Sequence, residues 1–372
     1  MNITTRKRLI RPAVALSVSL LVSGVAAAAV SERKAAVVPD LLELPAQKAS
    51  SALHSIQLGI ARAGERLVSV GEQGIILLSD DDGKSWRQST GVPVSVTLTD
   101  VQFASAKQGW ASGHSGVILH TADGGENWEL QVDGYRVADI IYNEAKRRAE
   151  LGLPGAEDAL TNANYLVKEG ADKPFLDLYI ADEQHGWAIG AYGIALATRD
   201  GGKSWQSIVD LLHNDSGRHL YSIQPEQDGM VVAGEQGSLF SRGGGQVEYQ
   251  RVETPYAGTF FGFIPLPSQK LLAFGLRGNV WREQDSGWHR IDLGSEATLT
   301  AGMSLSDGTL LLGDESGHLV VSRDRGRSFS KADVSPTASI TAMVQARDGA
   351  IVLSTARGPV RLDTPFSKPE AQ

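Results

Sequence analysis

The sequence contains no cysteine, which excludes disulfide bonds, thiolate metal sites and the attachment of lipid to an N-terminal cysteine. Aromatic residues make up only 6% of the chain. A nucleophile elbow, a phosphate-binding loop and a dinucleotide-binding glycine motif are also missing. Because the formal net charge is −8, we do not expect nucleic acid or anionic lipid as the main partner.

The first 29 residues have the three parts of a secretory signal peptide. A basic stretch at 6–11 precedes an apolar stretch at 13–25 and a run of alanines at 26–29 that offers cleavage sites. The apolar stretch is shorter than the roughly 20 residues of a spanning helix, which favours cleavage over an uncleaved anchor. Removing four basic residues and no acids would change the formal charge from −8 to −12. We therefore expect a periplasmic mature protein, residues 30–372, that is not inserted in the membrane.

A short pattern recurs along the rest of the chain and is clearest at residues 71–86, GEQGIILLSDDDGKSW. It consists of a Gly-x-x-Gly tip, an apolar run and an acidic glycine turn that ends at a Trp. Close copies lie at 113–128, 190–205 and 313–329, and weaker copies begin at Gly234, Gly275 and Thr355. The second glycines of the tips are Gly74, Gly116, Gly193, Gly237, Gly278, Gly317 and Gly358. Successive steps between them are 42, 77, 44, 41, 39 and 41 residues, so one step is longer by about 35.

A period of about 40 residues built from short strands predicts an all-β, seven-bladed β-propeller with four antiparallel strands in each blade. In the second repeat we expect strands at 98–103, 109–112, 117–120 and 128–131. The seventh repeat has room for only three strands. We expect residues 35–38 to supply its fourth strand and close the ring, because an open ring would leave an unpaired sheet edge. A disordered N-terminal tail is the alternative.

The long step corresponds to residues 133–173, where the hydrophobic period changes from that of strands to that of helices. Apolar residues between 137 and 145 and between 160 and 167 have helical spacing, and Pro154-Gly155 separates the two segments. We therefore predict a helical hairpin inserted between blades 2 and 3. Insertions in repeat proteins often lie on the binding face.

Four of the acidic turns match the pattern Ser/Thr-x-Asp-x-Gly-x-Ser/Thr-Trp, which is called the Asp box or BNR repeat. Their key residues are Ser79, Asp81, Gly83 and Trp86; Thr121, Asp123, Gly125 and Trp128; Thr198, Asp200, Gly202 and Trp205; and Ser322, Asp324, Gly326 and Phe329. We interpret them as structural, because a short carboxylate can accept hydrogen bonds from the amides of its own turn. Calcium binding is the alternative, but one such turn lacks the roughly six to eight oxygen ligands that calcium takes.

Asp boxes also occur in sialidases and other glycosidases, so a glycan-acting hydrolase or a sugar-binding module is the alternative function. A glycosidase needs two carboxyl groups across a cleft, and no acidic residue outside the turns stands out. The Phe-Arg-Ile-Pro element of sialidases is missing; the nearest stretch, Phe263-Ile264-Pro265, has no Arg. The segment His213–His219 has no recognised ligand spacing. We therefore expect no catalytic residue, no metal and no cofactor.

Two stretches, 98–113 and 175–190, carry the form Asp-Val/Leu-x-Phe/Ile, a turn and Gly-Trp-Ala-x-Gly, and each leads into an Asp box. This form resembles the photosystem II assembly and stability factor family, over about residues 53–363. The resemblance implies a seven-bladed propeller of the thylakoid lumen or periplasm. It also implies a protein that is not an enzyme and helps to assemble a membrane protein complex.

The chain differs from the cyanobacterial members of that family, which are typically lipoproteins, because it lacks cysteine and carries the insertion. It is more similar to the proteins of non-photosynthetic bacteria. Those are often encoded beside RND-type exporters, so the resemblance implies a membrane transporter of this type as a candidate partner.

The order of the strands places the Gly-x-x-Gly tips and the insertion on one face of the ring, opposite the Asp boxes. We expect the partner-binding face to include Glu72, Gln73, His114, Tyr192, Gln236, Arg277, Glu315 and Arg357 from the tips, and Ile140, Tyr142 and Arg147 from the insertion. Arg277 and Arg357 could each pair with a partner carboxylate, or could be ordinary solvated charges.

Overall fold

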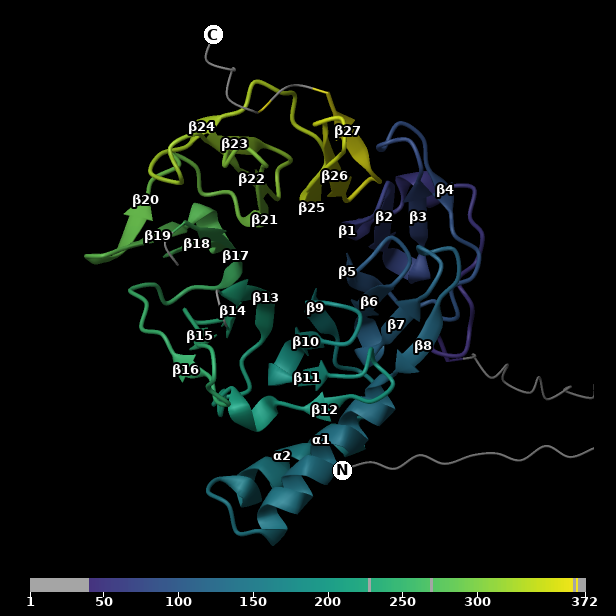
Figure 1. Ribbon diagram of the computed structural model, residues 1–372, viewed down its shortest axis with the longest axis vertical. Helices are drawn as coiled ribbons and strands as arrows, with labels where there is room; N and C mark the ends of the chain where they lie inside the picture. Colours follow the sequence, from purple (N-terminus) through teal and green to yellow (C-terminus); the bar gives the residue numbers. More distant parts are fainter. Residues whose placement is uncertain (1–39, 227–228, 268–269, 364–365, 367–372) are drawn as a thin grey trace, which may run out of the picture. The chain divides into compact units, whose positions relative to one another are not determined.

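The computed structural model describes residues 40–226, 229–267, 270–363 and 366. The predicted signal peptide, residues 1–29, and the predicted closing strand, residues 35–38, lie outside these residues. The described strands form seven antiparallel sheets that follow one another in chain order around a common centre (Figure 1). This arrangement confirms the predicted all-β, seven-bladed propeller.

Each sheet is a meander, in which a strand pairs with the next strand of the chain. Blade 1 contains β1 (Gln57–Ala63), β2 (Arg66–Gly71), β3 (Ile76–Ser79) and β4 (Arg87–Gln88). Blade 2 contains β5 (Leu98–Phe103), β6 (Gly109–Gly113), β7 (Ile118–Thr121) and β8 (Glu129–Val132). Blade 3 contains β9 (Phe175–Ile180), β10 (Gly186–Gly190), β11 (Ala195–Thr198) and β12 (Gln206–Ser207). Blade 4 contains β13 (Leu220–Glu226), β14 (Gly229–Gly234), β15 (Leu239–Arg242) and β16 (Gln250–Arg251).

The remaining blades continue the same order. Blade 5 contains β17 (Phe260–Leu266), β18 (Lys270–Gly275), β19 (Val280–Gln284) and β20 (Gly287–Ile291). Blade 6 contains β21 (Leu299–Ser304), β22 (Leu310–Asp314), β23 (Leu319–Ser322) and β24 (Ser330–Lys331). Blade 7 contains β25 (Ile340–Gln345), β26 (Ile351–Thr355) and β27 (Val360–Leu362), so it has three strands within the described residues.

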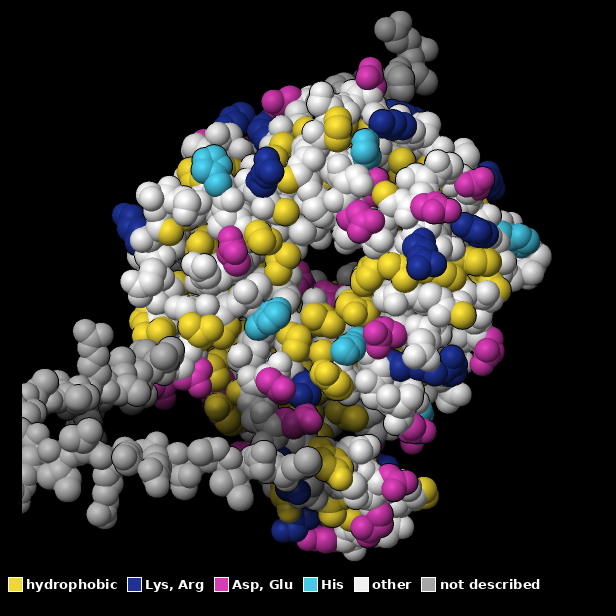
Figure 2. Space-filling model, turned by 180° about the vertical axis from the view of Figure 1, so that it is seen from behind, with side chains coloured by type: hydrophobic (Ala, Val, Ile, Leu, Met, Phe, Trp, Pro, Cys, Tyr) yellow, Lys and Arg dark blue, Asp and Glu magenta, His cyan; other side chains and the backbone are white. Residues whose placement is uncertain are grey.

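Blades 7 and 1 contact each other through their inner strands. The hydroxyl of Thr341 donates a hydrogen bond to the carbonyl oxygen of Gln57 at 2.6 Å. The hydroxyl oxygens of Ser69 and Ser354 lie 2.9 Å apart and are buried. The described residues of the first and last blades therefore join the ends of the sheet array. Figure 2 shows the opening at the centre of the ring, with hydrophobic side chains along part of its edge.

The blades are held together by apolar side chains that alternate along the strands, as the two-residue period of a strand requires. Between blades 1 and 2, Val68 and Leu78 pack in one cluster with Val101 and Leu119. Trp128, the last residue of an Asp box, is buried in the same cluster. The aromatic residue of that turn therefore contributes to the contact between blades.

The insertion is the predicted hairpin, formed by α1 (Gly134–Glu150) and α2 (Ala156–Glu169). The carboxylate of Asp133 accepts a hydrogen bond from the amide of Arg136 at 2.9 Å and so caps α1. Gly155 and Gly170 flank α2 with φ of 71° and 79°, a conformation that favours glycine. Among the described residues, no helix combines the length and the apolar character needed to cross a bilayer.

One side of α1 packs against blade 3. Val137, Ile141 and Ala145 share a buried cluster with Ile194 and Trp205. The hairpin consequently lies at the outer rim of the ring, next to β12 (Figure 1). The hairpin is therefore anchored to the ring by buried apolar contacts.

The tips form short 3₁₀ turns, including η2 (Glu72–Gly74), η3 (His114–Gly116), η4 (Ala191–Gly193) and η6 (Leu276–Gly278); η1 (Ala52–His54) and η5 (Val209–Leu211) lie elsewhere. The second glycine of a tip lies against the connection to the next blade. A Cβ atom on Gly116 would come within 2.7 Å of Gly134, the first residue of α1. The tips and the insertion thus lie on one face of the ring. The Asp boxes lie on the other face, with the turns between the first and second strands; for example, Gly124 N donates a hydrogen bond to Lys107 O.

Candidate interaction site at the helical insertion

The four Asp boxes share one hydrogen-bond pattern. In blade 1, Asp81 accepts hydrogen bonds from Ser85 N at 2.8 Å, Ser85 Oγ at 2.6 Å and Ser79 Oγ at 2.9 Å. The bonds from Ser85 lower the pKa of Asp81 to about 2. Equivalent bonds are made by Asp123, Asp200 and Asp324. These carboxylates therefore hold the turns in shape.

The tips present side chains outward because of an unusual backbone conformation. In five tips the residue before the second glycine is not glycine and still has a positive φ, between 53° and 57°: Gln73, Ser115, Tyr192, Gln236 and Arg277. This left-handed conformation is costly for a residue with a Cβ atom. The exposed tip residues of the predicted face are Gln73, His114, Tyr192, Gln236, Arg277, Glu315 and Arg357.

Two residues of the predicted face form hydrogen bonds with the chain's own backbone. The half-buried Glu72 accepts a hydrogen bond from Ile56 N at 2.9 Å. Glu315 accepts one from Thr298 N at 3.0 Å. Each carboxylate therefore braces a tip against the connection between blades, a role that the sequence analysis did not foresee.

The insertion residues of the predicted face have different surroundings. Ile140 and Tyr142 are half-buried and pack against the core of the hairpin. Arg147 is exposed, and its guanidinium lies 2.6 Å from the carboxylate of Glu144 in the same helix. Of these three side chains, only Arg147 lies mainly at the surface.

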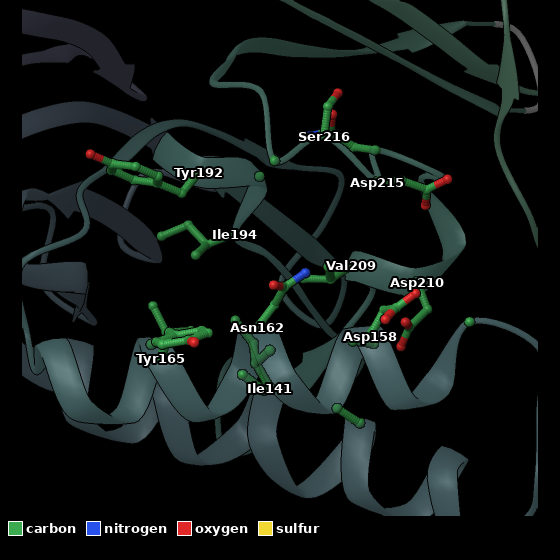
Figure 3. A pocket seen from close by; sticks show the side chains of 18 of the residues that line it. Ile141, Asp158, Asn162, Tyr165, Tyr192, Ile194, Val209, Asp210, Asp215 and Ser216 are labelled. Carbon is green, nitrogen blue, oxygen red and sulfur yellow. The ribbon is translucent and has the colours of Figure 1, made fainter.

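A pocket of about 800 Å³ lies between the hairpin and blade 3. Its walls are α1, α2, the tip η4 and the connection 209–217 that leads to blade 4 (Figure 3). The floor is apolar and includes Ile141, Ala145, Ala163 and Ile194, all buried. A concave, mainly apolar site of this size with a few polar groups is typical of a binding site.

One end of the pocket is aromatic. Tyr165 of α2 and Tyr192 of the tip η4 lie on the same side, with Ile194 between them (Figure 3). Both tyrosines are exposed, at 59% and 60%. The ammonium group of Lys173 lies 4.7 Å from the centre of the Tyr192 ring, which helps to fix that ring.

The other end of the pocket is acidic: Asp158 and Asp210 lie close together, and Asp215 lies farther along the same side (Figure 3). The guanidinium of Arg148 lies 3.3 Å from the carboxylate of Asp210. Burial raises the pKa of Asp210, and the charge of Arg148 partly opposes that effect. The pocket therefore combines an aromatic end, an apolar floor and an acidic end.

Exposed apolar side chains are frequent on the hairpin and the tip η4, and two of them, Tyr165 and Tyr192, line the pocket. Eleven large hydrophobic residues of the described chain are exposed, and six of these belong to the hairpin or the adjacent tip: Tyr135, Leu151, Leu153, Tyr165, Val167 and Tyr192. Clustered exposed apolar groups are typical of surfaces that contact another molecule.

A second polar cluster was missed by the sequence analysis. Asp100 of β5 and Asp177 of β9 hydrogen-bond to each other, and Asp177 also accepts a bond from Ile223 N of blade 4 at 2.7 Å. Burial raises the pKa of Asp100 to about 6, and burial and the charge of Asp100 raise that of Asp177. The pair thus ties the inner strands of three blades together. The recurrence of Asp at this position in two repeats was the available signal.

This acid pair does not have the geometry of a glycosidase site. The two carboxyl groups of such an enzyme are separated by about 5 Å or more and lie on either side of the substrate bond. Asp100 and Asp177 instead bond directly to each other and to backbone amides. Within the described residues, no group of three or more His, Asp or Glu side chains could hold a metal ion. His213 pairs with Glu248 at 3.2 Å.

These features define a β-propeller of the Asp-box type with a pocket between an inserted helical hairpin and blade 3. The family model described as photosynthesis system II assembly factor YCF48 matches residues 84–145 and 157–262. Over these residues, which are somewhat less than half of the chain, the protein is similar to that family. The chain is also 24% identical, over 280 residues, to the photosystem II assembly lipoprotein Ycf48 of Synechococcus sp. (strain CC9902), covering 70% of each protein.

Solved structures show the same fold. A YCF48 bound to a D1 peptide superimposes with a TM-score of 0.61 and 16% identity, covering 86% of this chain and 99% of the other. YCF48 from Cyanidioschyzon merolae superimposes with a TM-score of 0.60 and 11% identity, covering 86% of this chain and 98% of the other. The WD40 propeller domain of Doa1 superimposes with a TM-score of 0.60 and 12% identity, covering 87% of this chain and 96% of the other. At these identities the similarity establishes the propeller fold.

Proposed function

We propose that this protein is a non-catalytic periplasmic scaffold that binds a segment of a membrane protein and helps to assemble or operate the complex to which that protein belongs. The observation that carries this proposal is the number of exposed aromatic and apolar side chains on the hairpin and the tip η4, of which Tyr165 and Tyr192 line the pocket. A propeller supplies a rigid frame for such a surface, because each blade is fixed by its neighbours.

The comparisons support the same class of function. One relative is a photosystem II assembly lipoprotein, and one similar solved structure is YCF48 bound to a D1 peptide. The basic and apolar stretches of residues 6–29 support a location in the periplasm. We further propose an RND-type exporter as the membrane complex, on the family resemblance alone.

The experiment is a crosslinking pull-down from membranes of cells that produce the protein. The full chain is compared with a variant that lacks residues 135–170. Gly134 and Ala171 are close enough to be joined directly, since a Cβ atom on Gly134 would come within 2.7 Å of the Ala171 Cα atom. We expect a membrane protein to be recovered by the full chain and lost by the variant.

Equal recovery of the membrane protein by both forms, or recovery by neither, would contradict the proposal. The deletion uncovers Ile194 and Trp205 of blade 3, so its fold must be checked by circular dichroism and thermal unfolding. If the deletion variant does not fold, the substitution Tyr165→Ser takes its place, because this side chain is exposed and its loss leaves the core intact.

A further inference from the structure

More carboxylates than cations line the pocket, and not every carboxylate has an ion-pair partner there. Four carboxylates and two cations line it: Asp158, Glu169, Asp210 and Asp215, with Arg148 and Lys173. Each cation is already paired within the chain. Arg148 faces Asp210 at 3.3 Å, and Lys173 lies 2.8 Å from Glu169 and 2.6 Å from Asp172.

Asp158 and Asp215 remain available to a ligand. Both are exposed, and neither forms an ion pair with another described residue. They line the same side of the pocket from two separate elements, α2 and the connection 209–217, with Asp210 next to Asp158 and Asp215 farther along (Figure 3). Both carboxylates would attract a cationic group that enters this end of the pocket.

The acidic end and the apolar remainder of the pocket together indicate which kind of ligand would fit. The apolar floor leads from Asp158 and Asp215 to the exposed rings of Tyr165 and Tyr192 (Figure 3). Lys and Arg side chains have an apolar stem and a charged end, which match an apolar floor that ends at carboxylates. Tyrosine rings at the opposite end suit a large apolar or aromatic neighbour.

We propose that the pocket binds an extended peptide segment of the partner that carries a Lys or Arg next to a large apolar residue, an inference that rests on the proposed function of this face. The cation binds at the acidic end lined by Asp158 and Asp215, and the apolar residue packs on Tyr165 and Tyr192. An acidic segment is disfavoured, because the two cations of the pocket are occupied by the chain's own carboxylates.

Asp158 also has a structural role, and the test must separate this role from the recognition of charge. It lies in the first turn of α2, where a negative charge stabilises the helix through its dipole. Asp215 lies in a connection and has no such role. The single variant Asp215→Asn therefore tests charge recognition without a change in helix stability.

The probe is a random dodecapeptide library displayed on phage and selected against the full chain. We expect the selected peptides to be enriched in Lys or Arg beside an apolar or aromatic residue. The affinity of one synthetic selected peptide, measured by calorimetry, should fall at least about tenfold in the variant D158N/D215N and several-fold in D215N. It should also weaken as salt is added, because the attraction is screened.

The matched control is E183Q/D333N, which removes two exposed carboxylates outside the pocket. This control should bind the peptide as the unmodified protein does. Selection of peptides without Lys or Arg, or equal affinity in D158N/D215N and the control, would overturn the inference. If the membrane protein is lost with the hairpin deletion but retained by D158N/D215N, the proposed function stands and only the pocket chemistry is refuted.

Discussion

The guanidinium of Arg148 lies 3.3 Å from the carboxylate of Asp210 and joins α1 to the connection that follows blade 3. Both side chains are largely shielded from water, with exposures of 22% and 19%. The contact sets the position of the hairpin relative to the ring and therefore the shape of the pocket. Its removal is the simplest way to test whether the hairpin is held by specific contacts.

The variant Arg148→Ala should destabilise the protein by about 1–3 kcal/mol, because it leaves the carboxylate of Asp210 partly buried without its partner. Hydrogen exchange should become faster in α1 and α2, and thermal unfolding should occur at a lower temperature. The control is Arg147→Ala, since the exposed Arg147 pairs only with Glu144 of its own helix among the described residues. Similar effects of the two substitutions would refute the anchoring role of Arg148.

Substitution of an Asp box should affect stability and leave binding unchanged. Asp81→Ala removes three hydrogen bonds within its turn, at a cost of about 1 kcal/mol at this partly exposed site. The pKa of Asp81 is lowered to about 2, so its contribution is present above about pH 4 and is lost as the pH falls through 2. Denaturant titrations at neutral pH and in acid measure both effects. A large loss of peptide binding in Asp81→Ala would contradict the structural role.

The pair Asp100 and Asp177 should give the opposite pH dependence. Both carboxyl pKa values are raised, that of Asp100 to about 6, so the folded state holds protons that the unfolded state has released. The free energy of unfolding should therefore decrease as the pH rises from about 4 through 6. Asp177→Asn, which imitates the protonated group, should flatten this dependence. An unchanged pH profile in that variant would show that the pair does not share a proton.

The tip residue Tyr192 should matter for binding more than for folding. Its φ of 56° costs about 1 kcal/mol in a residue with a Cβ atom, and glycine removes that cost. The variant Tyr192→Gly also loses the contact with Lys173, worth about 0.5–1 kcal/mol, so stability should change little. Peptide affinity should fall about tenfold, as expected for a lost aromatic contact at the centre of an interface.

The control for this substitution is Gln73→Gly, which changes the same backbone position in the tip of blade 1. Gln73 has a φ of 56° and is exposed, so its replacement should stabilise the protein and leave binding unchanged. Equal peptide affinities in the two glycine variants would show that the ring of Tyr192 does not contact the ligand.

The blades could be predicted from sequence because each one depends on local rules. A tip needs a glycine with positive φ that lies close to the next connection; a Cβ atom on Gly237 would come within 1.7 Å of the carbonyl oxygen of Tyr256. The spacing of these glycines therefore counts the blades. The hairpin could also be predicted from sequence, since Asp133 caps α1 and the apolar residues of α1 have helical spacing.

The site itself depends on contacts between distant parts of the chain and could be predicted only in part. Tyr192 was expected at the binding face. Tyr165 and Asp158 are brought to the pocket by the packing of α2 in the cluster that contains Ile194, and Asp215 lies on the connection 209–217. Nothing in the local sequence distinguishes Asp158 from other acids of a helix first turn. Glu72 looked like a free tip residue, yet its carboxylate braces its own blade.

The central claim is that the face formed by the tips and the hairpin, and not the Asp-box face, contacts a membrane protein. The most direct test replaces Tyr165 with a photoreactive phenylalanine analogue in cells that produce the protein, and compares it with the same analogue at Lys203, an exposed residue of the Asp box in blade 3. The account predicts an ultraviolet-dependent adduct with one membrane protein from position 165 and none from position 203. An adduct from position 203 alone, or no adduct from position 165 while the partner is recovered by chemical crosslinking, would contradict it.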